Sequence, residues 1–135
     1  TCALPIFILE VAAGERDALS VYGTDYPTPD GTAIRDYIHI ADLAAAHVLA
    51  VGATERPGHR VYNLGNGEGF SVREMVDAAE RVTGRRIATV DAPRRDGDPV
   101  RLVASSERIR RELGWRPQHT DVERMIADAW AHRAD

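Results

Sequence analysis

The chain has 135 residues, of which 44% are hydrophobic and 28% are charged, and its formal net charge at pH 7 is −4. This composition excludes a disordered chain, and the negative net charge argues against nucleic acid as the main partner. No apolar run reaches the ~20 residues that a membrane helix needs, and a single cysteine, Cys2, suits a reducing cytoplasm.

The first half of the chain alternates apolar segments with one long polar turn. A secretion signal is not expected at the start, because the apolar run there lacks basic residues in front of it. The predicted elements are a helix over residues 5–13, a strand over 17–22, a turn over 23–34, a strand over 35–40 and a helix over 42–52.

The second half continues the alternation, which favours an α/β fold. Ser71-Val-Arg-Glu74 and Thr120-Asp-Val-Glu123 are two capping boxes that predict helix starts. We expect Trp115 and Trp130 to pack the last two helices together. The predicted elements are strands over 61–64 and 87–90, and helices that end at Gly84, at Gly114 and near Trp130.

Two polar loops carry the candidate binding residues. The first holds Asp25, Tyr26, Asp30 and Thr32 and leads to Arg35, whose planar guanidinium suits a diphosphate. The alternative is a solvated loop in which Arg35 pairs with a neighbouring aspartate, Asp36 or Asp42. The second is Ala92-Pro-Arg-Arg-Asp-Gly-Asp98, which is either a compact polar clamp or a charge-balanced surface turn.

Other motifs give weaker signals. The glycine-rich segment over residues 61–71 invites a dinucleotide-binding interpretation, but the third position of that fingerprint falls on Phe70 instead of glycine. The scattered histidines and single cysteine have no zinc-ligand spacing. We interpret His39 and His47 as packing or local hydrogen-bonding residues, and we interpret the arginines at positions 108, 110 and 111 as a solvated face.

The run from Tyr22 to His47 closely resembles the UDP-glucose 4-epimerases, a family of the extended short-chain dehydrogenases/reductases. The resemblance extends from about Val11 to Trp130. It implies the C-terminal part of that fold: a small mixed sheet with flanking helices, without the N-terminal Rossmann half. Residues 1–135 would then form one incomplete UDP-sugar-binding region.

The resemblance also implies the roles of individual residues. Ser20 and Tyr22 would line the uracil site, and Arg35 and Arg95 would reach the diphosphate from distant loops. Val72 would lie beside the nucleotide, and Asp98 would accept hydrogen bonds from the ribose. Leu102 departs from a tyrosine that is frequent in the family, and residues 1–5 lack its substrate-binding asparagine.

Family chemistry uses bound NAD and a tyrosine followed four residues later by a lysine, but this chain has no lysine. We therefore expect no catalytic, cofactor-binding or metal-binding residue here, and no activity of the chain alone. The implied function is a UDP-sugar-binding part in UDP-glucose/UDP-galactose interconversion, within galactose metabolism. The expected partners are a UDP-sugar and the missing N-terminal half or a homodimer partner. The alternatives are a fragment of a UDP-sugar decarboxylase or nucleotide-sugar dehydratase, or a non-catalytic nucleotide-binding module.

Overall fold

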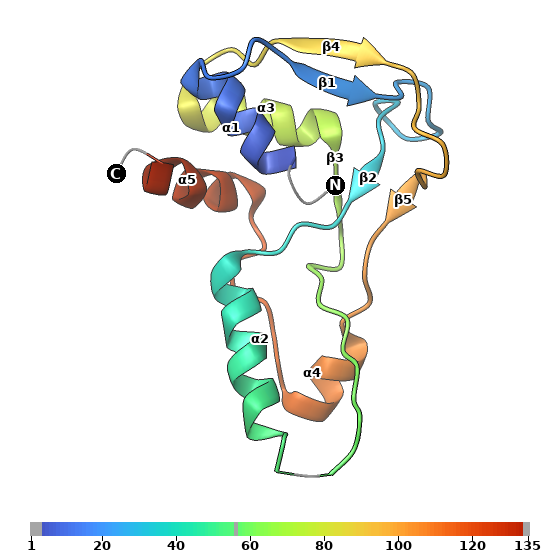
Figure 1. Cartoon of the computed structure of the whole chain (residues 1–135), viewed down its shortest axis with the longest axis vertical. Helices are drawn as coiled ribbons and strands as arrows, with labels where there is room; N and C mark the ends of the chain where they lie inside the picture. The colour runs from blue at the N-terminus through green and yellow to red at the C-terminus, as the bar shows by residue number, and fades with distance from the viewer. Residues whose placement is uncertain (1–3, 56, 134–135) are drawn as a thin grey trace.

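The computed structural model describes residues 4–55 and 57–133, so Cys2 and the departure from the family at residues 1–3 lie outside the described part. The predicted α/β class is confirmed. The elements, labelled in Figure 1, are α1 (Leu4–Ala13), β1 (Leu19–Tyr22), β2 (Ile34–Arg35), α2 (Ile40–Gly52), β3 (Phe70–Ser71), α3 (Val72–Thr83), β4 (Thr89–Ala92), β5 (Arg101–Leu102), α4 (Glu107–Leu113) and α5 (Val122–Arg133).

The strands form two small sheets, one of which is the small mixed sheet that we expected. β1 pairs in parallel with β4, in a register that places Tyr22 opposite Ala92. β2 is central in the other sheet, antiparallel to β3 and parallel to β5. This second sheet is mixed, and it brings the start of α3 beside the segment that follows the long polar turn.

Two strand predictions were wrong. Strand β2 ends at Arg35 instead of reaching residue 40, and the predicted last residues of the strand instead lead into α2, where His39 is the N-cap: its Nδ1 accepts a hydrogen bond from the Ala41 N–H at 3.1 Å. Residues 61–64 carry a strand pattern but form no strand in the described structure. A strand needs a hydrogen-bonding neighbour, and none of the described elements pairs with this segment.

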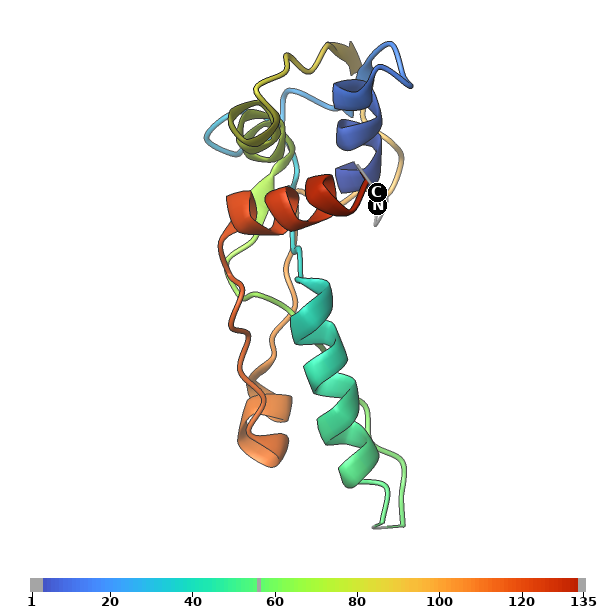
Figure 2. The ribbon, with the colours of Figure 1, turned by 90° about the vertical axis from the view of Figure 1, so that its left-hand side faces the viewer.

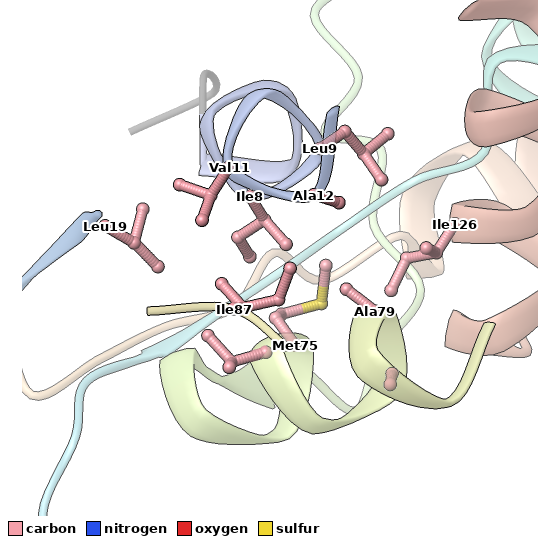
Figure 3. Close-up of a cluster of buried hydrophobic side chains, with 11 residues drawn as sticks. Ile8, Leu9, Val11, Ala12, Leu19, Met75, Ala79, Ile87 and Ile126 are labelled. Carbon is pink, nitrogen blue, oxygen red and sulfur yellow. The ribbon is translucent and has the colours of Figure 1, made fainter. Parts of the chain in front are cut away.

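The main core lies in the part of the molecule that contains α1, α3, α5 and both sheets, which we call the sheet lobe. Side chains of α1, α3 and α5 point toward one another there (Figure 3). The predicted capping box at Ser71 is confirmed, and Gly84 ends α3 with φ near +65°, a backbone conformation that favours glycine. The predicted capping box at Thr120 was wrong, because the Asp121 carboxylate accepts from the N–H groups of Glu123 and Arg124 instead.

A second, smaller core joins α2 and α4 in what we call the helical lobe, which extends from the sheet lobe (Figures 1 and 2). Trp115 is its centre, packed with Ala46 and Ile109, and its indole N–H donates to the Asp42 carbonyl at 2.9 Å. Trp130 packs against the core of the other lobe. The prediction that both tryptophans pack the last two helices together was therefore wrong.

Candidate functional site: a pocket in the sheet lobe

A pocket of about 160 Å³ opens in the sheet lobe, where α1, β1, β2 and the start of α3 meet the loop that follows β4. All six residues that the sequence analysis named for substrate binding line it. They come from four separate segments of the chain. The lining residues are Leu4, Phe7, Arg16, Leu19, Ser20, Tyr22, Ala33, Arg35, Val72, Arg95 and Asp98.

Strand β1 supplies one wall of this pocket. Its side chains alternate, with Leu19 and Val21 buried while Ser20 and Tyr22 share the opposite, more exposed face. Because β4 runs parallel to β1 and ends opposite Tyr22, the loop after β4 returns to the same end of the pair. That register explains why Arg95, which is distant in sequence, reaches the pocket beside Tyr22.

The guanidinium of Arg95 lies 3.6 Å from the centre of the Tyr22 ring. Hydrogen bonding to Arg95 and the positive charge of Arg95, with a smaller contribution from Ser20, lower the pKa of the Tyr22 phenol below its ordinary value. Stacking of this kind holds a flexible arginine in place while its edge stays open to a ligand. Arg95 and Tyr22 therefore form one preassembled unit of aromatic surface and positive charge.

Arg35 is held from within the protein. Its Nη2 donates to Asp98 Oδ1 at 2.8 Å, and its Nη1 donates to the carbonyls of Ile34 and Pro99 at 2.7 and 2.9 Å. These three bonds use three of the five N–H donors of a guanidinium. The alternative in which Arg35 pairs with a neighbouring aspartate was wrong, since Asp36 accepts from the N–H groups of Asn66 and Ala104.

The neighbouring Arg94 has a different environment. Its Nε donates to Asp25 Oδ1 at 2.7 Å, and its guanidinium lies 4.2 Å from the centre of the Tyr26 ring. The hydrogen bond from Arg94 also lowers the pKa of the Asp25 carboxyl. The two adjacent arginines therefore divide two roles: Arg94 ties the second polar loop to the first, and Arg95 lines the pocket.

Five lining residues were missed by sequence reasoning. Leu4 and Phe7 are three positions apart on α1, so their shared face was readable from the helical period. Arg16 lies over the Phe7 ring at 4.5 Å and donates to Glu10 Oε2 at 2.9 Å, but it follows the helix in an irregular segment and gave no signal. The sequence around Leu19 and Ala33 likewise gave no signal that these residues line a pocket.

The glycine-rich segment does not fit a dinucleotide. A side chain at Gly65 would meet the Asp36 carboxylate and the Ala104 carbonyl, so this glycine packs against protein. At the start of α3 the Glu74 carboxylate accepts from the Ser71 N–H at 2.7 Å. A diphosphate placed there would face the carboxylates of Glu74 and Asp30, which accepts from the Ser71 hydroxyl, instead of free N–H groups. That the chain alone binds no NAD stays a prediction.

The structure also bears on a metal site, on a membrane-spanning helix and on the roles of two histidines. Among residues 4–55 and 57–133, no cluster of three or more His, Cys, Asp or Glu side chains is arranged to hold a metal ion. No helix within those ranges is long and apolar enough to span a membrane. His39 and His47 make the local contacts that we predicted, to the Ala41 N–H and the Leu43 carbonyl respectively.

Comparison with known proteins decides the family. The sequence profile of the family described as GDP-mannose 4,6 dehydratase matches residues 2–129. The chain belongs to this family. Relatives of this GDP-mannose 4,6 dehydratase family member include the UDP-glucose 4-epimerase of Corynebacterium glutamicum, 54% identical over 124 residues, and that of Streptomyces lividans, 57% identical over 125 residues.

These alignments cover 92% and 91% of this chain but only 38% and 37% of the two relatives. A solved UDP-glucose 4-epimerase superposes with a TM-score of 0.90 at 49% identity, covering 98% of this chain and 40% of that one. The Bifidobacterium longum enzyme, solved in complex with NAD+ and UDP, gives 0.88 at 40% identity, over 96% and 39% of the two chains. The resemblance to UDP-glucose 4-epimerases is thereby confirmed for this family member, which spans about two-fifths of the length of its relatives.

Proposed function

We propose that this chain is the UDP-sugar-binding part of a UDP-glucose 4-epimerase, and that it is inactive alone. The observation that carries the proposal is the convergence of Ser20, Tyr22, Arg35, Val72, Arg95 and Asp98 on one pocket. The reaction that it serves is the interconversion of UDP-glucose and UDP-galactose in galactose metabolism, in the cytoplasm.

The chemistry of the pocket suits a nucleoside diphosphate. The Tyr22 ring, with Arg95 stacked on one face, offers aromatic surface to a base, and the guanidinium groups of Arg35 and Arg95 offer charged donors to a diphosphate. Two N–H donors of Arg35 are left over after its bonds to described residues. Asp98 keeps a second carboxylate oxygen with which it can accept from a ribose hydroxyl.

The pocket is smaller than a complete nucleotide-sugar site. Its volume of about 160 Å³ lies below the roughly 300–1,000 Å³ of typical small-molecule sites. In our proposal the remaining walls come from the part of the family fold that lies outside the matched two-fifths of the relatives. That part also supplies NAD binding and the Tyr/Lys pair. The lack of lysine in this chain supports that division of roles.

The outer face of α2 supports the proposal that another protein segment packs against this helix. Apart from Asp42, which is buried, and His47, the residues of this helix are apolar or glycine, so the helix has an apolar character that suits burial. Yet Ile40, Val48 and Val51 on its outer face are 72%, 73% and 69% exposed. We take the occupant of this face to be the portion of the family fold that the relatives have beyond their matched two-fifths, with a homodimer partner as the alternative.

A nucleotide-sugar dehydratase part is the second candidate, because the matching family profile is described as a GDP-mannose 4,6 dehydratase. The two candidates differ in the base that they bind. Calorimetric titration of the chain with UDP, GDP and uridine separates them. We expect UDP to bind, GDP to bind at least tenfold more weakly, and uridine to bind weakly because it lacks the diphosphate. Tighter binding of GDP contradicts the epimerase assignment, and binding of neither diphosphate contradicts both.

A further inference from the structure

Asp30 lies outside the pocket, yet its carboxylate joins two segments that form part of the pocket wall. One oxygen, Oδ1, accepts from the Thr32 N–H at 2.8 Å and from the Thr32 hydroxyl at 2.7 Å. The other, Oδ2, accepts from the hydroxyl of Ser71, which caps α3. Asp30 thus binds the end of the first polar loop and the first turn of a helix 41 positions further along the chain.

The two hydroxyl groups pass this link on to the helix. Thr32 Oγ1 accepts from the Arg73 N–H at 3.3 Å, and Ser71 Oγ accepts from the Glu74 N–H at 3.0 Å. Each hydroxyl has one proton, and that proton is directed to Asp30, so each has its lone pairs free to accept from the helix. The Asp30 carboxylate therefore caps α3 indirectly, through the hydroxyl groups of Thr32 and Ser71. Its negative charge also suits the N-terminus of the helix.

The residues that follow the two hydroxyls line the pocket. Ala33 comes directly after Thr32, and Val72 comes directly after Ser71. These two wall residues are bonded to each other, since the Val72 N–H donates to the Ala33 carbonyl at 3.2 Å. Thr32 and Ser71 are themselves buried, so water does not compete for their hydroxyl groups.

Asp30 is ionised in this setting. Burial raises its pKa, but hydrogen bonds from Ser71 and Thr32 and the charge of Arg73 outweigh burial and hold the pKa below its ordinary value. The turn that presents Asp30 also requires Gly31, whose φ is near +80° and whose added side chain would meet the Thr24 carbonyl. The loop is therefore built to deliver a charged carboxylate to this point.

We infer that Asp30 is a positioning residue for the nucleotide-binding pocket: through Thr32 and Ser71 it sets where Ala33 and Val72 lie in the pocket wall. This inference rests on the proposed function. This role differs from a purely stabilising one, because substitution of a residue that only stabilises the fold lowers the unfolding temperature and leaves the affinity of the folded protein unchanged.

Two variants separate these roles. Asp30→Asn keeps the shape but removes the charge and places an NH₂ group opposite the Ser71 hydroxyl. Asp121→Asn is the matched control, since Asp121 also caps a helix, α5, at 2.7 and 3.1 Å from two N–H groups, and does not line the pocket. Each variant is titrated with UDP at a temperature where circular dichroism shows that it is folded, and the amide exchange of Val72 is measured by NMR.

We expect Asp30→Asn to weaken UDP binding about tenfold and to speed Val72 exchange, while Asp121→Asn changes neither by more than twofold. Unchanged affinity in folded Asp30→Asn overturns the inference. If Asp30→Asn does not fold, Thr32→Val takes its place, because it keeps the side-chain volume and removes the hydroxyl group that links Asp30 to α3. The same changes in UDP affinity and in Val72 exchange are then expected of it. If the wild-type chain does not bind UDP, the proposed function fails. The positioning claim is then decided by Val72 exchange alone, and unchanged exchange overturns it.

Discussion

Arg35 and Asp98 lie 63 positions apart in the sequence, yet their side chains meet at 2.8 Å in the wall of the pocket. The pair joins β2 to the segment that leads into β5, and the Pro99 carbonyl accepts from the same guanidinium. Because the Arg35 side chain is almost fully buried, its charge needs these partners in the free protein. The pocket therefore holds a positive charge whose position is fixed before any ligand arrives.

Asp98→Asn tests how much the fold depends on this pair. The substitution leaves Arg35 with its two carbonyl partners but removes the opposite charge, so we expect the free energy of unfolding to fall by about 1–3 kcal/mol. Urea denaturation followed by circular dichroism measures the change. Asp96→Asn, on the exposed part of the same loop, is the control and should differ by less than about 0.5 kcal/mol. Equal stability of the two variants contradicts the importance of the pair.

Asp42 should make stability depend on pH. Burial raises its pKa, but the N–H groups of Gln118 and His119 donate to its carboxylate at 2.9 Å each, and together with the His119 side chain they lower the pKa below the ordinary value. A lowered folded-state pKa means that Asp42 stabilises the protein above the unfolded pKa of about 4. This contribution is lost as the pH falls through the lower folded-state value.

Asp42→Asn should therefore be less stable than wild type by about 2–3 kcal/mol at pH 7, and the difference should shrink below about pH 4. Urea denaturation at a series of pH values measures both. Asp77→Asn, on an exposed face of α3, is the control for the substitution itself at each pH. A difference that stays constant down to pH 3 contradicts the linkage.

Trp115 should dominate the helical lobe. Its side chain is buried at 1% exposure among Ala46 and Ile109, so Trp115→Ala should cost about 3–5 kcal/mol through lost packing. Thermal unfolding followed by circular dichroism measures the loss. Trp115→Phe should recover part of it, because it restores ring volume but lacks the donor to the Asp42 carbonyl. If Trp115→Ala and Trp115→Phe unfold at the same temperature, that result counts against a packed core at this position.

The outer face of α2 should make the isolated chain self-associate. Val48→Glu places a charge on that face, where the native side chain is 73% exposed. We expect it to reduce association in sedimentation velocity and to change stability by less than about 0.5 kcal/mol. Ala46→Glu is the contrasting variant, since Ala46 is buried against Trp115, and it should unfold the lobe. If the wild-type chain stays strictly monomeric at high concentration, the prediction that the outer face of α2 drives self-association is contradicted.

The six residues named from the resemblance line one pocket, although their binding roles stay predictions, whereas two of the predicted strands were wrong. The capping box at Ser71 is a local pattern that the sequence shows directly, whereas the β1–β4 register that brings Arg95 beside Tyr22 is seen only in the structure. Residues 61–64 have the strand pattern, but pairing depends on a neighbour that the described chain does not supply. Likewise, Arg16 lines the pocket only because the chain turns after α1, and no short-range pattern specifies that turn.

The most direct test compares Arg95→Ala with Arg94→Ala. The two arginines are adjacent, and each stacks on a tyrosine, but only Arg95 lines the pocket. Calorimetric titration of both folded variants with UDP gives the result. We predict that Arg95→Ala weakens UDP binding at least tenfold, as loss of a charged contact to the diphosphate requires, and that Arg94→Ala stays within about threefold of wild type. Equal affinities of the two variants, or a larger loss in Arg94→Ala, would contradict the pocket as the nucleotide-binding site.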